Sequence, residues 1–150
     1  MKYKVTKTYG HDLGMSCVFR QPSAKSHCSL LHGYSLAFEL VFTTDKLTPE
    51  GWVIDFGSLG SVKDWLKQNF DHTLVLAATD PQREEIMRLH RKGIARVVIM
   101  PSVGCEAFAR HVAEYTQKWL ELVGSDATLE SVTVREHSSN AATFICTPSI

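Results

Sequence analysis

The chain has 150 residues, with 16 basic and 16 acidic side chains, so its formal net charge at pH 7 is zero. Hydrophobic residues make up 44% and charged residues 21%, which argues against a disordered chain, a collagen-like repeat and a disulfide scaffold. Balanced charge also argues against a general nucleic-acid binder, whose affinity comes from excess lysine and arginine, although a locally basic pocket can still hold a small anion.

The alternation of side chains in the first part of the chain predicts strands. Residues 2–9 alternate, and a strand resumes over 15–20 after a kink at a glycine. The polar residues 21–31 include Pro22 and predict a loop. Residues 34–43 alternate apolar and polar side chains, which indicates a strand with one buried face.

Helices dominate the middle of the chain, and strands return at its end. Asp55 is a suitable cap for a helix over about 57–69. The apolar residues 73–78 are compatible with either a strand or a buried loop. The remaining predicted elements are a helix from Asp80-Pro81 to Lys92, a short strand over 95–100, a long helix over about 104–122, and strands over 129–136 and 141–147.

This order predicts an α+β fold. Strand pairs separated by helices indicate a four-stranded antiparallel sheet with helices on one face, plus an inserted helix and short strand at about 79–101. The length suits one domain over 1–150. A lone sheet leaves unpaired edges, and a homo-oligomer is a common way to cover them.

The cysteine pattern and the N-terminus predict a compartment. The four cysteines are widely spaced and contain no C-x-x-C pair, so we expect neither disulfides nor a cysteine-rich structural zinc site. No uncharged apolar run approaches the roughly 20 residues that cross a bilayer, and residues 1–5 show no apolar secretory segment. We therefore expect a cytoplasmic protein with no membrane partner.

Two short motifs carry possible acid–base chemistry. Cys28 and His32 lie where a loop leads into a strand, and a thiol there is either reactive or simply a small buried residue. In Asp71-His72 the carboxylate orients an imidazole base, or else it caps a helix beside a surface histidine.

Two glutamates are candidate binding residues. Glu136 shares a strand face with Val132 and Val134, where an ionised carboxylate is costly unless it is paired. Either the strand has ended before Glu136, or the carboxylate meets a buried donor, such as the edge of a guanidine-like ring. Glu106 lies in the first turn of a helix, where the helix dipole alone favours it.

Together these segments resemble the family of 6-pyruvoyltetrahydropterin synthase and bacterial 6-carboxytetrahydropterin synthase. The similar segments follow one another nearly from end to end. They are Cys28-x3-His32-Gly33-x-Ser35, Gly51-Trp52-Val53-Ile54-Asp55-Phe56-x2-Leu59, Phe70-Asp71-His72-x-Leu74, Glu106-Ala-Phe-Ala109 and Val134-Arg-Glu136.

The resemblance implies a fold, a reaction and roles. The fold is the tunnelling fold, whose subunits form rings, often hexamers, with active sites between subunits. The reaction converts dihydroneopterin triphosphate, for bacterial members within queuosine biosynthesis. By position, Cys28 is the thiol acid–base, His72 its partner, Asp71 the orienting carboxylate, Glu136 the pterin anchor and Glu106 a support for the ring pocket.

The family's zinc ligands are the main departure. Three histidines hold that zinc, and here only His32 remains, since Phe19 and Tyr34 stand at the other two positions. One histidine cannot hold zinc in a three-ligand catalytic site, so we expect altered or weakened metal use. Cys17, His27 and His11 remain open as replacement ligands, and Arg20 or Lys25 as local triphosphate-binding groups.

Three functions follow as hypotheses. The first is a pterin-processing lyase of the 6-carboxytetrahydropterin synthase type. The second is a metal-independent enzyme acting on a pterin or purine-like ring, by analogy with other proteins of the same fold. The third is a non-catalytic protein that binds pterin or serves in assembly.

Overall fold

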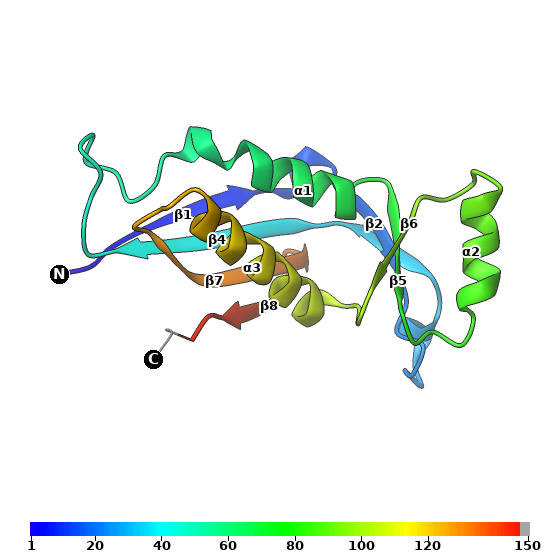
Figure 1. Cartoon of the computed structure of the whole chain (residues 1–150). Helices are drawn as coiled ribbons and strands as arrows, with labels where there is room; N and C mark the ends of the chain where they lie inside the picture. Colours follow the sequence, from blue (N-terminus) through cyan, green and yellow to red (C-terminus); the bar gives the residue numbers. More distant parts are fainter. Residues whose placement is uncertain (148–150) are drawn as a thin grey trace.

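The computed structural model describes residues 1–147 and contains two four-stranded sheets with three α-helices (Figure 1). The strands are β1 (Tyr3–Tyr9), β2 (Ser16–Phe19), β3 (His32–Ser35), β4 (Ala37–Thr44), β5 (Thr73–Ala77), β6 (Val97–Met100), β7 (Thr128–His137) and β8 (Asn140–Ile145). The helices are α1 (Gly60–Phe70), α2 (Arg83–Arg91) and α3 (Cys105–Leu122).

The predicted antiparallel sheet is confirmed, with the order β1-β4-β7-β8. The alternation in β4 sends Phe38, Leu40 and Phe42 into the core, where each is fully buried. Helix α3 packs on β7 and β8 and also contacts α1, so both helices cover one face of this sheet (Figure 1). Phe70 of α1 and Phe108 of α3 meet in that layer with ring centroids 5.1 Å apart.

A second sheet has the order β3-β2-β5-β6 and was not predicted. The segment that the sequence left open between strand and loop is β5, which pairs in parallel with both β2 and β6. All five of its residues are buried, as is usual for a parallel strand covered on both faces. The inserted helix and short strand are present as α2 and β6, and α2 packs on β5 and β6.

Two predicted elements are wrong in their boundaries. The strand expected over 34–43 is divided at Leu36 into β3 and β4, which belong to different sheets. Helix α2 begins at Arg83 rather than at Asp80, since residues 81 and 82 form a turn before it. The Asp80 carboxylate is bonded to Arg20 and to the backbone N–H of Gln82.

Within residues 1–147, no helix is both long enough and apolar enough to cross a membrane. The four cysteines are free thiols in this structure.

Candidate active site

Aromatic side chains line the contact between β2 and β3. Phe19 pairs with His32 in the register of the two strands, and their ring centroids are 5.2 Å apart. Tyr34 lies two residues further along β3, with its ring centroid 5.6 Å from that of His32 and 6.1 Å from that of Phe19. His137, at the end of β7, reaches the same cluster with its ring 6.0 Å from that of Tyr34.

Cys28 lies in a short 3-10 turn (His27–Ser29) between β2 and β3. The hydroxyl of Ser26 caps this turn by accepting a hydrogen bond from the backbone N–H of Cys28 at 3.3 Å. Cys28 is half-buried, whereas the other three cysteines are buried. Burial raises the pKa of both Cys17 and Cys105 to about 12, so these thiols stay protonated and unreactive at neutral pH.

Glu136 lies in a β-bulge near the end of β7. Arg135 pairs with Ala141 and His137 with Asn140, so β7 carries one extra residue opposite β8. Such a bulge redirects a side chain out of the regular alternation. Contrary to one of the two sequence alternatives, the strand has not ended at Glu136, since it continues to His137.

The Glu136 carboxylate is half-buried and has no hydrogen-bond or ion-pair partner within residues 1–147. Its charge nevertheless affects the pKa of the neighbouring Tyr34 hydroxyl. Burial raises the pKa of the Tyr34 hydroxyl, and the charges of Glu136, Cys28 and Cys105 raise it further. Burial also raises the pKa of the Cys105 thiol, and the charge of Glu136 raises it further. Tyr34 is therefore close enough to both Cys28 and Glu136 for their charges to affect its pKa.

Glu106 is exposed in the first turn of α3. The preceding Gly104 has a φ of 106°, a conformation that favours glycine. A side chain there would also bring its Cβ within 2.8 Å of the Gln21 amide nitrogen. That amide donates to the carbonyl of Val103 at 2.6 Å. Gln21 was not predicted as a site residue, because no local pattern connects it with Val103, 82 residues away.

Asp71 and His72 follow the last turn of α1. The Nδ1 of His72 lies 2.6 Å from Oδ1 of Asp71, and the imidazole is 85% exposed. The guanidinium of Arg96 fixes this corner by donating to the carbonyl of Asp71 at 2.7 Å. A shallow hollow surrounds the pair and is also lined by Lys67 and Gln68.

The Asp71–His72 pair lies apart from Cys28 within one chain. Strand β5 pairs in parallel with β2 so that Thr73 is opposite Cys17, which places His72 level with the start of β2. His32 is opposite Phe19 at the other end of β2, and Cys28 lies beyond that end. The span of β2 is about 10 Å at the usual rise per residue.

The residues at the family's zinc positions do not fit a three-histidine centre. Phe19 is 2% exposed and has no ligand atom, and its ring packs against Phe108 at 5.1 Å. The pKa of Tyr34 is raised, so its hydroxyl is not a phenolate ligand at neutral pH. The Nδ1 of His32 donates to the carbonyl of Leu30 at 2.6 Å, which leaves only Nε2 of this ring available to bind a metal. Within residues 1–147, no group of three histidine, cysteine or acidic residues is placed to hold a metal.

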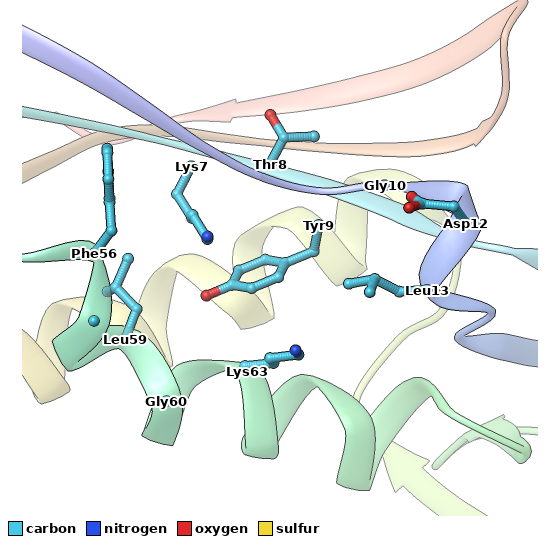
Figure 2. A pocket seen from close by; sticks show the side chains of 11 residues that line it. Lys7, Thr8, Tyr9, Gly10, Asp12, Leu13, Phe56, Leu59, Gly60 and Lys63 are labelled. Carbon is cyan, nitrogen blue, oxygen red and sulfur yellow. The ribbon is translucent and has the colours of Figure 1, made fainter.

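Arg20 is not a free triphosphate-binding group, contrary to one expectation from the sequence. Its guanidinium is bonded to both carboxylate oxygens of Asp80 and to the carbonyl of Ser29. Another hollow, with a volume of about 300 Å³, lies between β1 and the start of α1 and is lined by Tyr9 and two lysines (Figure 2). None of the predicted site residues lines it.

Comparison with known proteins identifies relatives. The model of the family described as 6-pyruvoyl tetrahydropterin synthase matches residues 11–145. A 6-carboxy-5,6,7,8-tetrahydropterin synthase from Aquifex aeolicus is 26% identical over 138 residues, covering 83% of this chain and 85% of that protein. A protein of the same name from Rickettsia felis is 34% identical over 80 residues, so this match spans 53% of this chain and 55% of that relative.

Solved structures share the fold. An uncharacterised protein from Wolinella succinogenes superposes with a TM-score of 0.82 at 17% identity, covering 97% of this chain and 98% of that one. The 6-pyruvoyl tetrahydropterin synthase of Plasmodium vivax gives a TM-score of 0.68 at 15% identity, covering 96% and 97% of the two chains. The predicted tunnelling fold is therefore confirmed.

Proposed function

The chain belongs to the 6-pyruvoyl tetrahydropterin synthase family, and we propose that it is a lyase of the 6-carboxytetrahydropterin synthase type acting on dihydroneopterin triphosphate or a related pterin. The observation that carries this proposal is the half-buried carboxylate of Glu136, which has no partner within residues 1–147 and is close enough to Tyr34 for its charge to raise the pKa of the Tyr34 hydroxyl. Relatives named as 6-carboxy-5,6,7,8-tetrahydropterin synthases support the same substrate class.

Glu136 is the proposed anchor for the pterin ring. A carboxylate accepts two parallel hydrogen bonds, and the 2-amino group and ring N–H of a pterin present two donors side by side. The bulge at the end of β7 directs this carboxylate, and Glu106 at the start of α3 supports the same pocket. The aromatic rings of His32 and Tyr34 offer apolar surface to the bound heterocycle.

The acid–base groups are Cys28 and His72. Asp71 holds the imidazole by its Nδ1, which leaves Nε2 to take a proton. In the elimination, a base removes a proton from a side-chain carbon of the substrate and the electron pair forms a carbon–carbon double bond. The carbon–oxygen bond breaks as this double bond forms, and triphosphate leaves with the bonding electrons. Lys67, beside Asp71, adds positive charge near this step.

We infer that two copies of the chain build one site. Cys28 lies beyond one end of β2, whereas His72 is level with the other end and its imidazole is exposed. A homo-oligomer, hexameric in the family's usual pattern, would bring the His72 of one copy to the Cys28 of another. The edge strands β1 and β8 are available for such association.

The proposed chemistry does not pass through a three-histidine zinc centre, because Phe19 and Tyr34 do not supply its ligands. The test is to incubate the purified protein with dihydroneopterin triphosphate, with and without added zinc, and to follow products by mass spectrometry. Release of triphosphate is expected. Absence of turnover in both conditions by a folded oligomer would refute the proposal, and pterin binding without turnover would favour a binding protein.

A second candidate function is a metal-independent reaction on a pterin that lacks the triphosphate. It is favoured by one observation, the commitment of Arg20 to Asp80 and Ser29, which removes a cation from the neighbourhood of Cys28. Activity on dihydroneopterin but not on its triphosphate would select this function.

A further inference from the structure

Arg20, the residue directly after β2, joins two segments that are distant in sequence. Its Nε and Nη2 donate to the two carboxylate oxygens of Asp80 at 2.8 and 2.6 Å. Its Nη1 donates to the carbonyl of Ser29 at 3.0 Å. Ser29 belongs to the turn that carries Cys28, and Asp80 begins the inserted segment that contains α2 and β6.

Asp80 of this pair is buried, and Arg20 is partly buried. The Asp80 side chain is 1% exposed and that of Arg20 is 17% exposed. The Asp80 carboxylate also accepts a hydrogen bond from the backbone N–H of Gln82 at 2.8 Å. A bidentate arginine–carboxylate pair of this kind fixes the direction of both side chains, and lysine cannot reproduce it.

Gln21 makes a second connection to the same turn. Its backbone N–H donates to the carbonyl of Cys28 at 2.9 Å. Its side-chain amide donates to the carbonyl of Val103 at 2.6 Å, immediately before the start of α3. The Cys28 turn is therefore connected through adjacent residues both to the inserted segment and to the segment that carries Glu106.

We propose that Arg20, Asp80 and Gln21 are positioning residues that fix the Cys28 turn between the inserted segment and the start of α3. The role assigned to the thiol rests on the proposed function, but the fixing itself does not. This assigns a task to the insertion at about 79–101, which supplies Asp80 as an anchor for the thiol. A buried ion pair adds little net stability compared with apolar packing, so its main contribution here is geometry.

The experiment measures how fast iodoacetamide alkylates Cys28, resolved from the other cysteines by peptide mass spectrometry. In Asp80→Asn, the freed turn exposes the thiol, and we expect the rate to rise at least fivefold. Arg20→Lys keeps the charge but loses the bidentate geometry, and we expect an intermediate rise. The matched control is Glu84→Gln, which breaks the exposed pair with Arg91 in α2 and leaves the rate unchanged.

Two further readouts separate positioning from general stability. In Asp80→Asn, hydrogen exchange at residues 26–29 rises by a larger factor than exchange in α3, which reports only the loss of global stability. In the turnover assay, the same variant lowers kcat more than it raises KM, since Glu136 lies outside these contacts. An unchanged alkylation rate and unchanged exchange at 26–29, in a folded variant, would overturn the proposal.

The experiments distinguish a failure of the proposed lyase function from a failure of the positioning proposal. If the wild type does not turn over a pterin but Asp80→Asn still accelerates alkylation of Cys28, the positioning contacts are supported and the lyase reaction is not. If Asp80→Asn does not fold, Gln21→Leu tests the same turn from its other side. That variant removes the Val103 contact without leaving a buried charge, and an unchanged alkylation rate in it would overturn the proposal.

Discussion

Oδ1 of Asp71 lies 2.6 Å from Nδ1 of His72, in a corner where the His72 backbone has a φ of 53°. Non-glycine residues seldom adopt this left-handed conformation, and it turns the imidazole out of the end of α1 into solvent. The orienting carboxylate and the exposed ring suit a general base that serves a site on another copy.

Replacing His72 by asparagine tests this base. Asparagine tolerates positive φ better than alanine does, so His72→Asn removes the imidazole with little backbone strain. We expect kcat to fall by about 10²- to 10⁴-fold, the usual contribution of acid–base catalysis, with an unchanged Tm. Steady-state kinetics and thermal unfolding measure both. His111→Gln is the control, and equal activity of His72→Asn and wild type would rule the role out.

The four cysteines are expected to differ in reactivity. Cys28 is half-buried, whereas Cys17, Cys105 and Cys146 are buried with raised pKa values. Iodoacetamide at pH 8 should therefore modify Cys28 first in the native protein and all four thiols in denaturant. Site-resolved mass spectrometry measures this order. Faster labelling of any buried cysteine would contradict the structure around Cys28.

Substitution of the carboxylate in Glu136→Gln should weaken pterin binding. Loss of a charged acceptor for two donors costs about 1.5–3 kcal/mol, or about ten- to a hundredfold in Kd. Isothermal calorimetry with a dihydropterin measures the change. Glu130→Gln, on the same strand but paired with Lys4, serves as the control. Equal affinity of Glu136→Gln and wild type would remove the anchoring role.

Histidines at positions 19 and 34 should create a three-histidine zinc site, which Phe19 and Tyr34 do not provide in the natural chain. The rings of Phe19, His32 and Tyr34 have centroids 5.2 to 6.1 Å apart, so Phe19→His with Tyr34→His places three imidazoles together. We expect this double variant to bind one zinc per chain. Zinc at a hundred times its Kd would stabilise it by about 2.7 kcal/mol. Equal zinc stabilisation of the wild type would show that replacement ligands exist.

The buried ion pair predicts a pH dependence of stability. The guanidinium of Arg20 lowers the pKa of the Asp80 carboxyl below its ordinary value. A carboxyl with a lowered folded-state pKa stabilises the fold above its unfolded pKa of about 4, and this contribution is lost as pH falls through the folded value. Asp80→Asn should therefore cost about 3 kcal/mol at pH 7 and progressively less below pH 4. Urea unfolding at pH 7 and pH 3 checks this, and a constant difference would contradict it.

Local patterns in the sequence were sufficient for much of the fold. The alternation through Phe38, Leu40 and Phe42 marks the buried face of β4. Asp55 does cap the segment before α1, since its carboxylate accepts from the backbone N–H of Gly57 at 2.8 Å. These features depend on residues within a few positions of each other, so spacing alone identifies them.

Features that depend on residues far apart in the sequence could not be predicted from local spacing. The five apolar residues of β5 have no period that separates a strand from a buried loop, and the second sheet depends on them. Arg20 and Asp80 are 60 residues apart, and Asp80 before a proline looks like an ordinary helix cap. The bulge that redirects Glu136 depends on the register with β8, which no single strand encodes.

The most direct test of the account is complementation between two inactive variants. Cys28→Ala and His72→Asn are purified separately, mixed under conditions that dissociate and reassociate the oligomer, and assayed with dihydroneopterin triphosphate. We predict that the mixture regains activity well above that of either variant alone, because some sites then combine the native Cys28 of one copy with the native His72 of another. No recovery, while wild type treated identically stays active, would contradict a site shared between copies.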